Sequence, residues 1–186
     1  MKTIVRAPNH VLTAPGKTVT KFDKRLVHLV ADLKATLTQT KNPKGVGLAA
    51  PQIGEPWRVF VTRPKESDPI RAFVNPVIVK SSTELTDGMP DRGDAKRDNK
   101  LEGCLSIPKI WGKLNRAKRV TLNFQDEKGD AHEETFTDFV ATIIQHETDH
   151  TNGILFPRRV LEQKGKLYQT AKDEEGKEVL EEIKLT

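Results

Sequence analysis

The residues best suited to chemistry are His146, Glu147 and His150, in the run Gln-His-Glu-Thr-Asp-His at residues 145–150. Residues four apart on a helix lie on one face, about 5–6 Å apart, so the ring nitrogens of His146 and His150 can converge on one metal ion. Glu147 is rotated off this line, where its carboxylate can reach a water molecule without binding the metal itself. The spacing therefore predicts a metal-dependent hydrolase.

The metal needs a third protein ligand. No histidine follows His150, and the later acids Glu162, Glu174 and Glu175 lie in polar sequence typical of a tail. Cys104, the only cysteine, is followed by apolar residues, and a thiolate with two imidazoles makes a tight site for a first-row metal. The residues alone leave open that Cys104 is a core cysteine packed as a small hydrophobic side chain.

A glycine-rich segment, Gly-Val-Gly-Leu-Ala-Ala-Pro-Gln at residues 45–52, superficially matches a dinucleotide-binding loop. Such a loop follows a β-strand, whereas here the preceding residues read as the end of a helix, so we reject that interpretation. Instead, the two glycines are expected to let the backbone pass close to a ligand, with Gln52 offering an amide donor.

Periodicity predicts the elements that position these groups. Leucine and valine recur at helical spacing in residues 23–39 after Asp23, a good N-cap, and a second helix is expected over residues 138–152. Thr137 or Asp138 is expected to cap that helix, and Asn152-Gly153 to end it. Apolar residues on two of its stripes indicate burial, so the polar stretch 145–150 is assigned to metal binding. Strands are expected at residues 58–62, 72–79, 120–125 and 132–136, the last two joined by a tight turn.

Composition bounds the class of protein. The 186 residues suit a single catalytic domain, residues 1–186, and 35% hydrophobic content without a long apolar run excludes a membrane role. One cysteine forms no intramolecular disulfide and no secretory signal is evident, so we expect a cytoplasmic protein. Residues 86–100 are expected to form a mobile loop, and residues 166–186 a C-terminal hairpin or tail.

The net charge of +5 is mildly basic and spread along the chain. The densest cluster of basic residues is compatible with weak binding to an anionic partner such as ribosomal RNA, although such clusters more often serve only to keep a protein soluble. The cluster consists of Lys109, Lys113, Arg116, Lys118 and Arg119.

Three segments together resemble the signature motifs of the peptide deformylases, in that family's order: residues 45–52, 102–106 (Glu-Gly-Cys-Leu-Ser) and 145–150. The resemblance implies an α+β fold, with antiparallel strands packed around a buried metal-binding helix. It implies that Cys104, His146 and His150 hold one divalent metal ion, Fe(II) by resemblance, with Zn, Ni or Co left open by the residues. It further implies removal of the formyl group from the formylmethionine of nascent peptides. The ribosome stays open as a partner, and DNA and membranes are not expected.

In the expected mechanism, Glu147 takes a proton from water and passes it to the leaving amine. The Gln52 side chain and the Leu105 backbone N–H stabilise the oxyanion. The methionine side chain is expected to enter a pocket and the substrate backbone to lie extended beside the glycine-rich segment. The residues predicted to bind substrate are Val46, Gly47, Glu102, Gly103, Phe139, Thr142 and Ile143.

Two alternatives belong to other classes. A metallopeptidase would cleave internal peptide bonds and ignore the formyl group. A non-catalytic module would use a structural metal site or its basic surface, but structural sites usually have four protein ligands and this chain offers three convincing ones.

Overall fold

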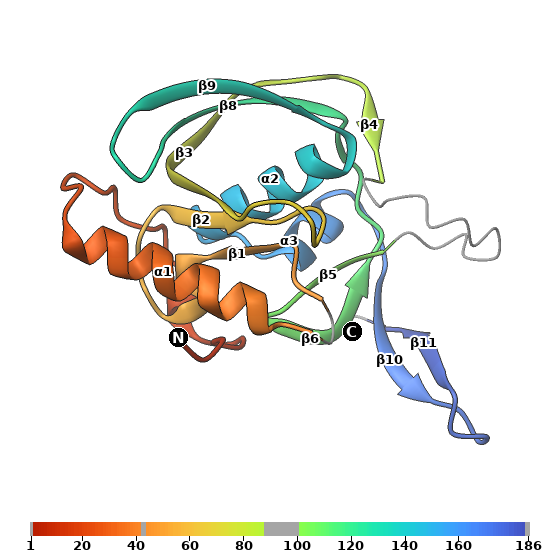
Figure 1. Cartoon of the computed structure of the whole chain (residues 1–186). Coiled ribbons are helices and arrows are strands. Elements are labelled where there is room, and N and C mark those ends of the chain that lie inside the picture. The colour runs from red at the N-terminus through yellow and green to blue at the C-terminus, as the bar shows by residue number, and fades with distance from the viewer. Residues whose placement is uncertain (1, 42–43, 88–100, 185–186) are drawn as a thin grey trace.

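Helix α2 (Asp138–Thr151) lies at the centre of the protein, with strands on several sides of it (Figure 1). The structure is a computed structural model that describes residues 2–41, 44–87 and 101–184. Antiparallel sheets and helices together give an α+β fold, as predicted. None of the described helices is long and apolar enough to cross a lipid bilayer.

The larger sheet is antiparallel, in the order β1-β2-β3-β8-β9, and both of its faces are packed at β2. Side chains of β2 alternate: Val59 and Val61 pack with helix α1 (Lys24–Gln39), whereas Phe60 packs toward α2 with Ile144. The sheet therefore separates two apolar cores, and α2 backs one of them. Its strands are Gly47–Ala49 (β1), Val59–Thr62 (β2), Arg71–Ser81 (β3), Arg119–Gln125 (β8) and Ala131–Thr137 (β9).

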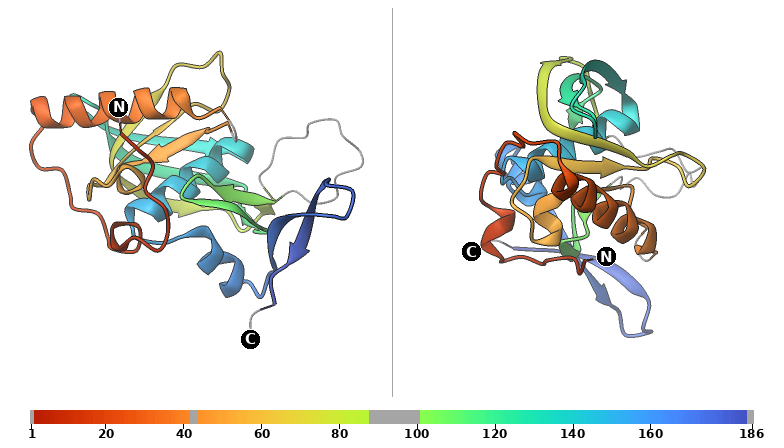
Figure 2. Two further views of the ribbon diagram at one scale, coloured as in Figure 1. Left: turned by 90° about the horizontal axis from the view of Figure 1, so that it is seen from below. Right: turned by 60° about the vertical axis from the view of Figure 1, so that its left-hand side comes forward.

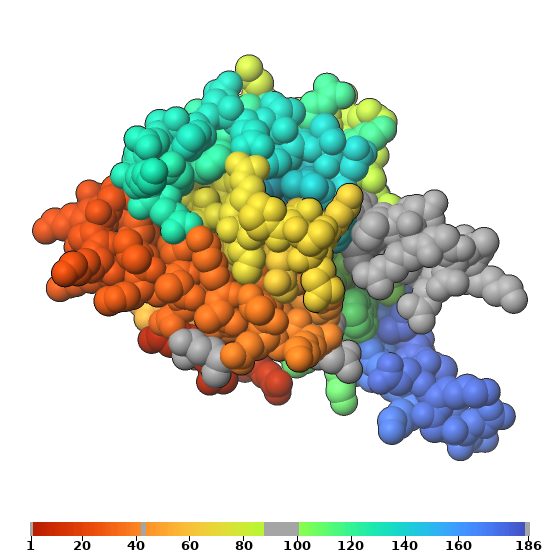
Figure 3. All heavy atoms as spheres, in the orientation of Figure 1, coloured from red at the N-terminus to blue at the C-terminus, as the bar shows by residue number. Residues whose placement is uncertain are grey.

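A second antiparallel sheet has the order β11-β10-β6-β5 and carries Cys104 on its edge strand β5. A third core joins it to helix α3 (Phe156–Glu162), with Cys104 packed near Phe156 and Val160. Figures 2 and 3 show the hairpin β10–β11 standing out from the body of the molecule. The strands are Glu102–Cys104 (β5), Ile107–Gly112 (β6), Leu167–Lys172 (β10) and Glu178–Glu182 (β11).

The remaining elements are short. Strands β4 (Leu85–Thr86) and β7 (Arg116–Ala117) pair antiparallel, and 3-10 turns occur at His10–Leu12 (η1) and Ala50–Ile53 (η2). Thr86 thus belongs to a strand rather than to the predicted loop. Most of that loop, residues 88–100, lies outside the described residues.

Most of the predicted elements are confirmed. Helix α1 begins after Asp23, whose side chain accepts a hydrogen bond from the Arg25 N–H at 2.9 Å. Strands β2, β3, β8 and β9 lie where expected, β8 and β9 form the predicted hairpin, and the C-terminal hairpin is present. Strands β1, β4, β6 and β7, the two 3-10 turns and helix α3 were not predicted.

The ends of α2 differ partly from expectation. Thr137 occupies the N-cap but its side chain makes no capping hydrogen bond, and Asp138 has a positive φ of 54°. At the other end Gly153 adopts a left-handed φ of 71°, as predicted. A Cβ at this position would lie 2.7 Å from backbone atoms of Thr13 and Ala14, so glycine is required for packing as well.

An N-terminal strap, defined as residues 2–16, is hydrogen-bonded to two of the motif segments and to the end of α2 just after the third. The backbone N–H of Val5 donates to the carbonyl of Gln52 at 2.8 Å, and that of Ala7 to Ser106 at 3.0 Å. The Gly16 N–H donates to the carbonyl of Thr151 at 2.9 Å, at the end of α2. These bonds link the segments around residues 45–52, 102–106 and 145–150.

Candidate metal centre and active site

Cys104, His146 and His150 come together between β5 and α2. One ligand atom of each lies within 4.8 Å of the others. Cys104 Sγ and His150 Nε2 are 3.2 Å apart, and the two imidazole rings have centroids 4.9 Å apart. The helical spacing thus brings the histidines to one face, as predicted, and the edge of a separate sheet adds the thiol that the family resemblance implies as the third ligand.

The donor set fits one divalent metal ion. Sulfur and imidazole nitrogen suit Zn, Fe and their neighbours, and all three side chains are largely withdrawn from solvent. His146 Nδ1 is held by Glu102 Oε1 at 2.6 Å, which leaves Nε2 to bind a metal. Within the described residues, three ligands converge and no fourth does, which is the arrangement of a site that keeps one position for water or substrate.

Glu147 lies beside this cluster with an unusual environment. Its side chain is buried, and Oε2 has no hydrogen-bond partner in the part of the chain described. Desolvation by burial raises the pKa of Glu147 to about 7. Such a carboxyl can both take up and release a proton near neutral pH.

Strand β1 allows Glu147 to occupy this place because it carries glycine there. A Cβ added at Gly47 would lie 2.4 Å from Glu147 Oε1. Motif segments from β1 and α2 therefore touch directly, and any side chain at Gly47 would displace the carboxylate.

Gln52 reaches the metal centre from η2, with its amide orientation fixed. Its Oε1 accepts the Ala49 N–H at 2.8 Å, so Nε2 points toward Cys104 Sγ, 3.5 Å away, and Ser106 Oγ, 3.4 Å away. The contact with Ser106 is long for an oxygen acceptor and sulfur is a weak acceptor, so this donor is available for a stronger one. Leu105 follows Cys104 directly, and its side chain packs against the core under α1.

A buried ion network supports the histidines, and sequence reasoning missed it. Arg116 donates to both oxygens of Glu102 at 2.7 Å and to Asp149 Oδ2 at 3.0 Å, while Arg159 donates to Asp149 Oδ1 at 2.8 Å. Arg116, assigned above to a solvated basic cluster, is only 6% exposed. The polar character of residues 145–150 therefore reflects these ion pairs as well as the metal ligands. The spacing of single charges along a sequence gives no signal for such a network.

The network fixes the charge states around it. Burial would raise the pKa of Glu102, but Arg116 and His146 outweigh burial and hold that pKa below its usual range. Burial would lower the pKa of His146, but the negative charge of Glu102 raises it well above the ordinary value. The pKa of His150 is lowered by burial and by His146. Glu102 is thus an ionised partner that orients His146.

The residues predicted to bind substrate lie around the same centre, with one qualification. Phe139, Thr142, Ile143 and His146 follow one stripe of α2, and Thr142 and Ile143 are 5% and 3% exposed. Val46 directly precedes β1, and Gly103 is in β5. Both strands are at sheet edges, so their free backbone groups can pair with an extended chain. The Glu102 side chain is committed to Arg116 and His146, which leaves only its backbone for a substrate.

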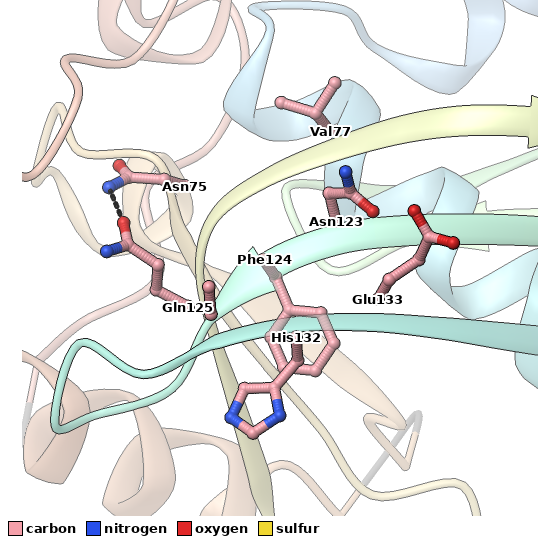
Figure 4. A pocket seen from close by; sticks show the side chains of 8 residues that line it. Asn75, Val77, Asn123, Phe124, Gln125, His132 and Glu133 are labelled. Carbon is pink, nitrogen blue, oxygen red and sulfur yellow. Dashed lines mark hydrogen bonds between the residues drawn. The ribbon is translucent and has the colours of Figure 1, made fainter.

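A pocket elsewhere on the molecule contains none of these residues. It lies on β3, β8 and β9, where Asn75 donates to Gln125 at 2.8 Å and the His132 ring stacks on Phe124 (Figure 4). Among the described residues, only the Cys104 cluster groups potential metal ligands, so the pocket on β3, β8 and β9 is not an alternative metal site.

Comparison with known proteins agrees with this geometry. The family model for polypeptide deformylase matches residues 1–166. The peptide deformylase of Heliobacterium modesticaldum is 38% identical over 159 residues, which cover 84% of this chain and 92% of that protein. The peptide deformylase of Pseudothermotoga lettingae is 37% identical over 146 residues, 78% of this chain and 75% of that protein.

Solved structures agree as well. A class I type b peptide deformylase from Acinetobacter baumannii with bound Met-Ala-Ser has a TM-score of 0.71 and 30% identity, covering 86% of this chain and 98% of that one. A peptide deformylase from Synechococcus elongatus in complex with actinonin has a TM-score of 0.73 and 30% identity, covering 85% of this chain and 78% of that one. Because the family model spans 166 residues of a 186-residue chain and these relatives share its sequence and fold, the chain belongs to the polypeptide deformylase family.

Proposed function

We propose that Cys104, His146 and His150 hold one divalent metal ion at which this peptide deformylase hydrolyses the formyl group on the N-terminal methionine of new polypeptides. The observation that carries the assignment is the convergence of these three ligands with Glu147, from two elements far apart in sequence. When bound, the metal would act as a Lewis acid that polarises the formyl carbonyl and lowers the pKa of water to about 7.

The chain's own residues supply the proton transfers. Glu147 accepts the proton of the attacking water at Oε2, the oxygen left unpaired by the described residues, and delivers it to the amine nitrogen as the C–N bond breaks. The products are formate and a free methionine amine. A carboxyl with a pKa near 7 is suited to both halves of this cycle.

Gln52 and Leu105 act on the formyl oxygen. As that oxygen gains negative charge, Gln52 Nε2 and the Leu105 backbone N–H donate hydrogen bonds to it. The fixed Oε1 of Gln52 keeps the amide from rotating away. These donors stabilise the transition state more than the substrate.

The substrate lies extended between the edges of β1 and β5, beside Val46, Gly47 and the backbone of Glu102 and Gly103. Its methionine side chain enters the space next to Phe139, Thr142 and Ile143. The ligand bound in the Acinetobacter structure, Met-Ala-Ser, has the form of a deformylated product, and this supports such a placement.

Fe(II) is the proposed metal, with Zn, Ni and Co as the alternatives that the same donors accept. Metal analysis after anaerobic purification decides between them. We further propose that the enzyme works in the cytoplasm on nascent chains, in the neighbourhood of the ribosome.

The test measures formate release from formyl-Met-Ala-Ser alongside metal content. Replacement of any one ligand, Cys104→Ala, His146→Ala or His150→Ala, is expected to lower bound metal and activity in step. Glu162→Gln, on the exposed end of α3, is the control and is expected to match the wild type. Full metal occupancy in Cys104→Ala, or cleavage of internal peptide bonds in preference to the formyl group, would overturn the assignment.

A further inference from the structure

The Thr142 hydroxyl is buried and has no partner in the part of the chain that the structure describes. Thr142 is 5% exposed, and its Oγ1 makes no hydrogen bond to any described residue. Leaving a buried hydroxyl unpaired is unfavourable, so a group in this position is expected to have a use.

Other helical threonines show that a backbone carbonyl of the same helix can serve as the partner of a threonine hydroxyl. Thr38 Oγ1 donates to the Lys34 carbonyl at 2.8 Å, and Thr151 Oγ1 donates to the Thr148 carbonyl at 2.8 Å. A helical threonine commonly uses a carbonyl three or four residues earlier in this way. Thr142 does not, so its hydroxyl remains free for something outside the helix.

The surroundings of Thr142 indicate what that partner is. It lies one turn before the proposed ligand His146, on the stripe that also carries Phe139 and Ile143. The side chains of these neighbours are apolar and offer no hydrogen-bond acceptor. A bound side chain that enters here meets an apolar wall with one hydroxyl donor in it.

We propose that Thr142 determines specificity by donating a hydrogen bond from its hydroxyl to the thioether sulfur of the substrate's methionine. This rests on the proposed function, and it adds that the pocket recognises sulfur and not only the length and shape of the side chain. Sulfur is a weak acceptor, but a buried donor gains from any partner and loses when none is present. Norleucine, which has a CH2 group in place of sulfur, would leave the hydroxyl unpaired, and sites built for a hydrogen bond discriminate against analogues that lack it.

The test compares formyl-Met-Ala-Ser with formyl-norleucyl-Ala-Ser as the ratio of their kcat/KM values. Wild-type enzyme is expected to prefer methionine by roughly three- to tenfold, the range that one neutral hydrogen bond supplies. Thr142→Val has nearly the same shape without the hydroxyl and is expected to bring the ratio close to one. Thr142→Ser keeps a hydroxyl and is expected to retain the preference.

Thr36→Val is the matched control. Thr36 is a helical threonine that is 4% exposed, but it lies in α1 and its hydroxyl bonds to the backbone of Lys2. Loss of the Thr36 hydroxyl is expected to leave the substrate ratio at the wild-type value.

Equal changes for both substrates in Thr142→Val would show that the residue only packs, and would overturn the inference. So would an unchanged ratio. If Thr142→Val does not fold, a comparison of Thr142→Ala with Thr142→Ser measures the same contrast. Absence of formate release from both peptides by the wild-type enzyme would instead refute the proposed function.

Discussion

At the scale of single residues, Glu147 is defined by what surrounds it rather than by its type. It is buried next to two proposed metal ligands, Oε2 is unpaired among the described residues, and Gly47 leaves room for the rest of the carboxylate. Glu134 and Glu162, by contrast, have exposed side chains and pair with arginines. Position and burial together support Glu147 as the proposed proton carrier.

Replacing Glu147 by Gln is therefore expected to preserve the metal and remove most turnover. Glutamine has nearly the same shape but does not accept the proton of water, and loss of such a group typically costs 10²–10⁴-fold in rate. Metal content by mass spectrometry and kcat on formyl-Met-Ala-Ser measure the two effects separately. A variant that keeps both metal and near wild-type kcat would show that another residue carries the proton.

At the scale of elements, local signals predict some pieces and not others. Helix α1 is predicted because its leucines follow a helical period, and the β8–β9 hairpin because Gly129 marks its turn. Strand β1 is too short and glycine-rich for a periodic signal, and α3 has Pro157 near its start and only seven residues. The metal ligands and Glu147 are predictable because their order along the chain is distinctive. Arg116 is not, because only the folded arrangement brings it to Glu102 and Asp149.

The contact of β1 with α2 predicts the effect of Gly47→Ala. The added methyl would meet Glu147 Oε1 at 2.4 Å, so the carboxylate must move while the ligands on β5 and α2 stay in place. Displacement of a catalytic group by about 1 Å costs on the order of 10²-fold in rate. Metal content is expected to be unchanged. In the double variant Gly47→Ala/Glu147→Asp the shorter acid makes room for the added methyl, and part of kcat is expected to return. If kcat does not return and metal is lost, the substitution has distorted the whole site rather than displaced one carboxylate.

The ion network of Glu102, Arg116 and Asp149, which joins β5, β7 and α2, predicts how the free energy of unfolding depends on pH. The pKa of Glu102 in the folded state lies below its ordinary value of 4.5, so ionised Glu102 stabilises the fold above that pH and the contribution is lost as pH falls. Glu102→Gln leaves Arg116 with one carboxylate fewer and is expected to cost about 3–5 kcal/mol at pH 7.

Urea unfolding of metal-free wild type and Glu102→Gln at several pH values measures this difference. The two free energies of unfolding are expected to converge as pH falls below about 4.5. Glu134→Gln, which removes an exposed partner of Arg71, is the control and is expected to change stability little. A difference between wild type and Glu102→Gln that stays constant with pH would mean that the charge of Glu102 is not what stabilises the network.

At the scale of the whole molecule, the candidate active site combines three segments from two sheets and a helix. The N-terminal strap connects them through backbone hydrogen bonds to Gln52, Ser106 and Thr151. Gln52 and Ser106, whose carbonyls accept the strap's hydrogen bonds, are 1% and 0% exposed. Ser106 is two residues from Cys104, and Gln52 is the proposed oxyanion donor. The strap is thus expected to affect chemistry that it does not touch.

Deleting residues 2–8 tests this role. The deletion removes the donors at Val5 and Ala7 and leaves two buried carbonyls without partners, each worth about 1–3 kcal/mol. We expect a lower melting temperature and, because Gln52 is freed on its backbone side, a lower kcat at full metal occupancy. Removing residues 174–176 from the exposed turn of the β10–β11 hairpin, far from these contacts in sequence, is the control and is expected to change neither quantity. A truncated enzyme with a lower melting temperature but unchanged kcat would show that the strap contributes to stability and not to catalysis. If neither value changes, the contacts of Cys104, Glu102 and Gly47 hold the three segments in place without the strap.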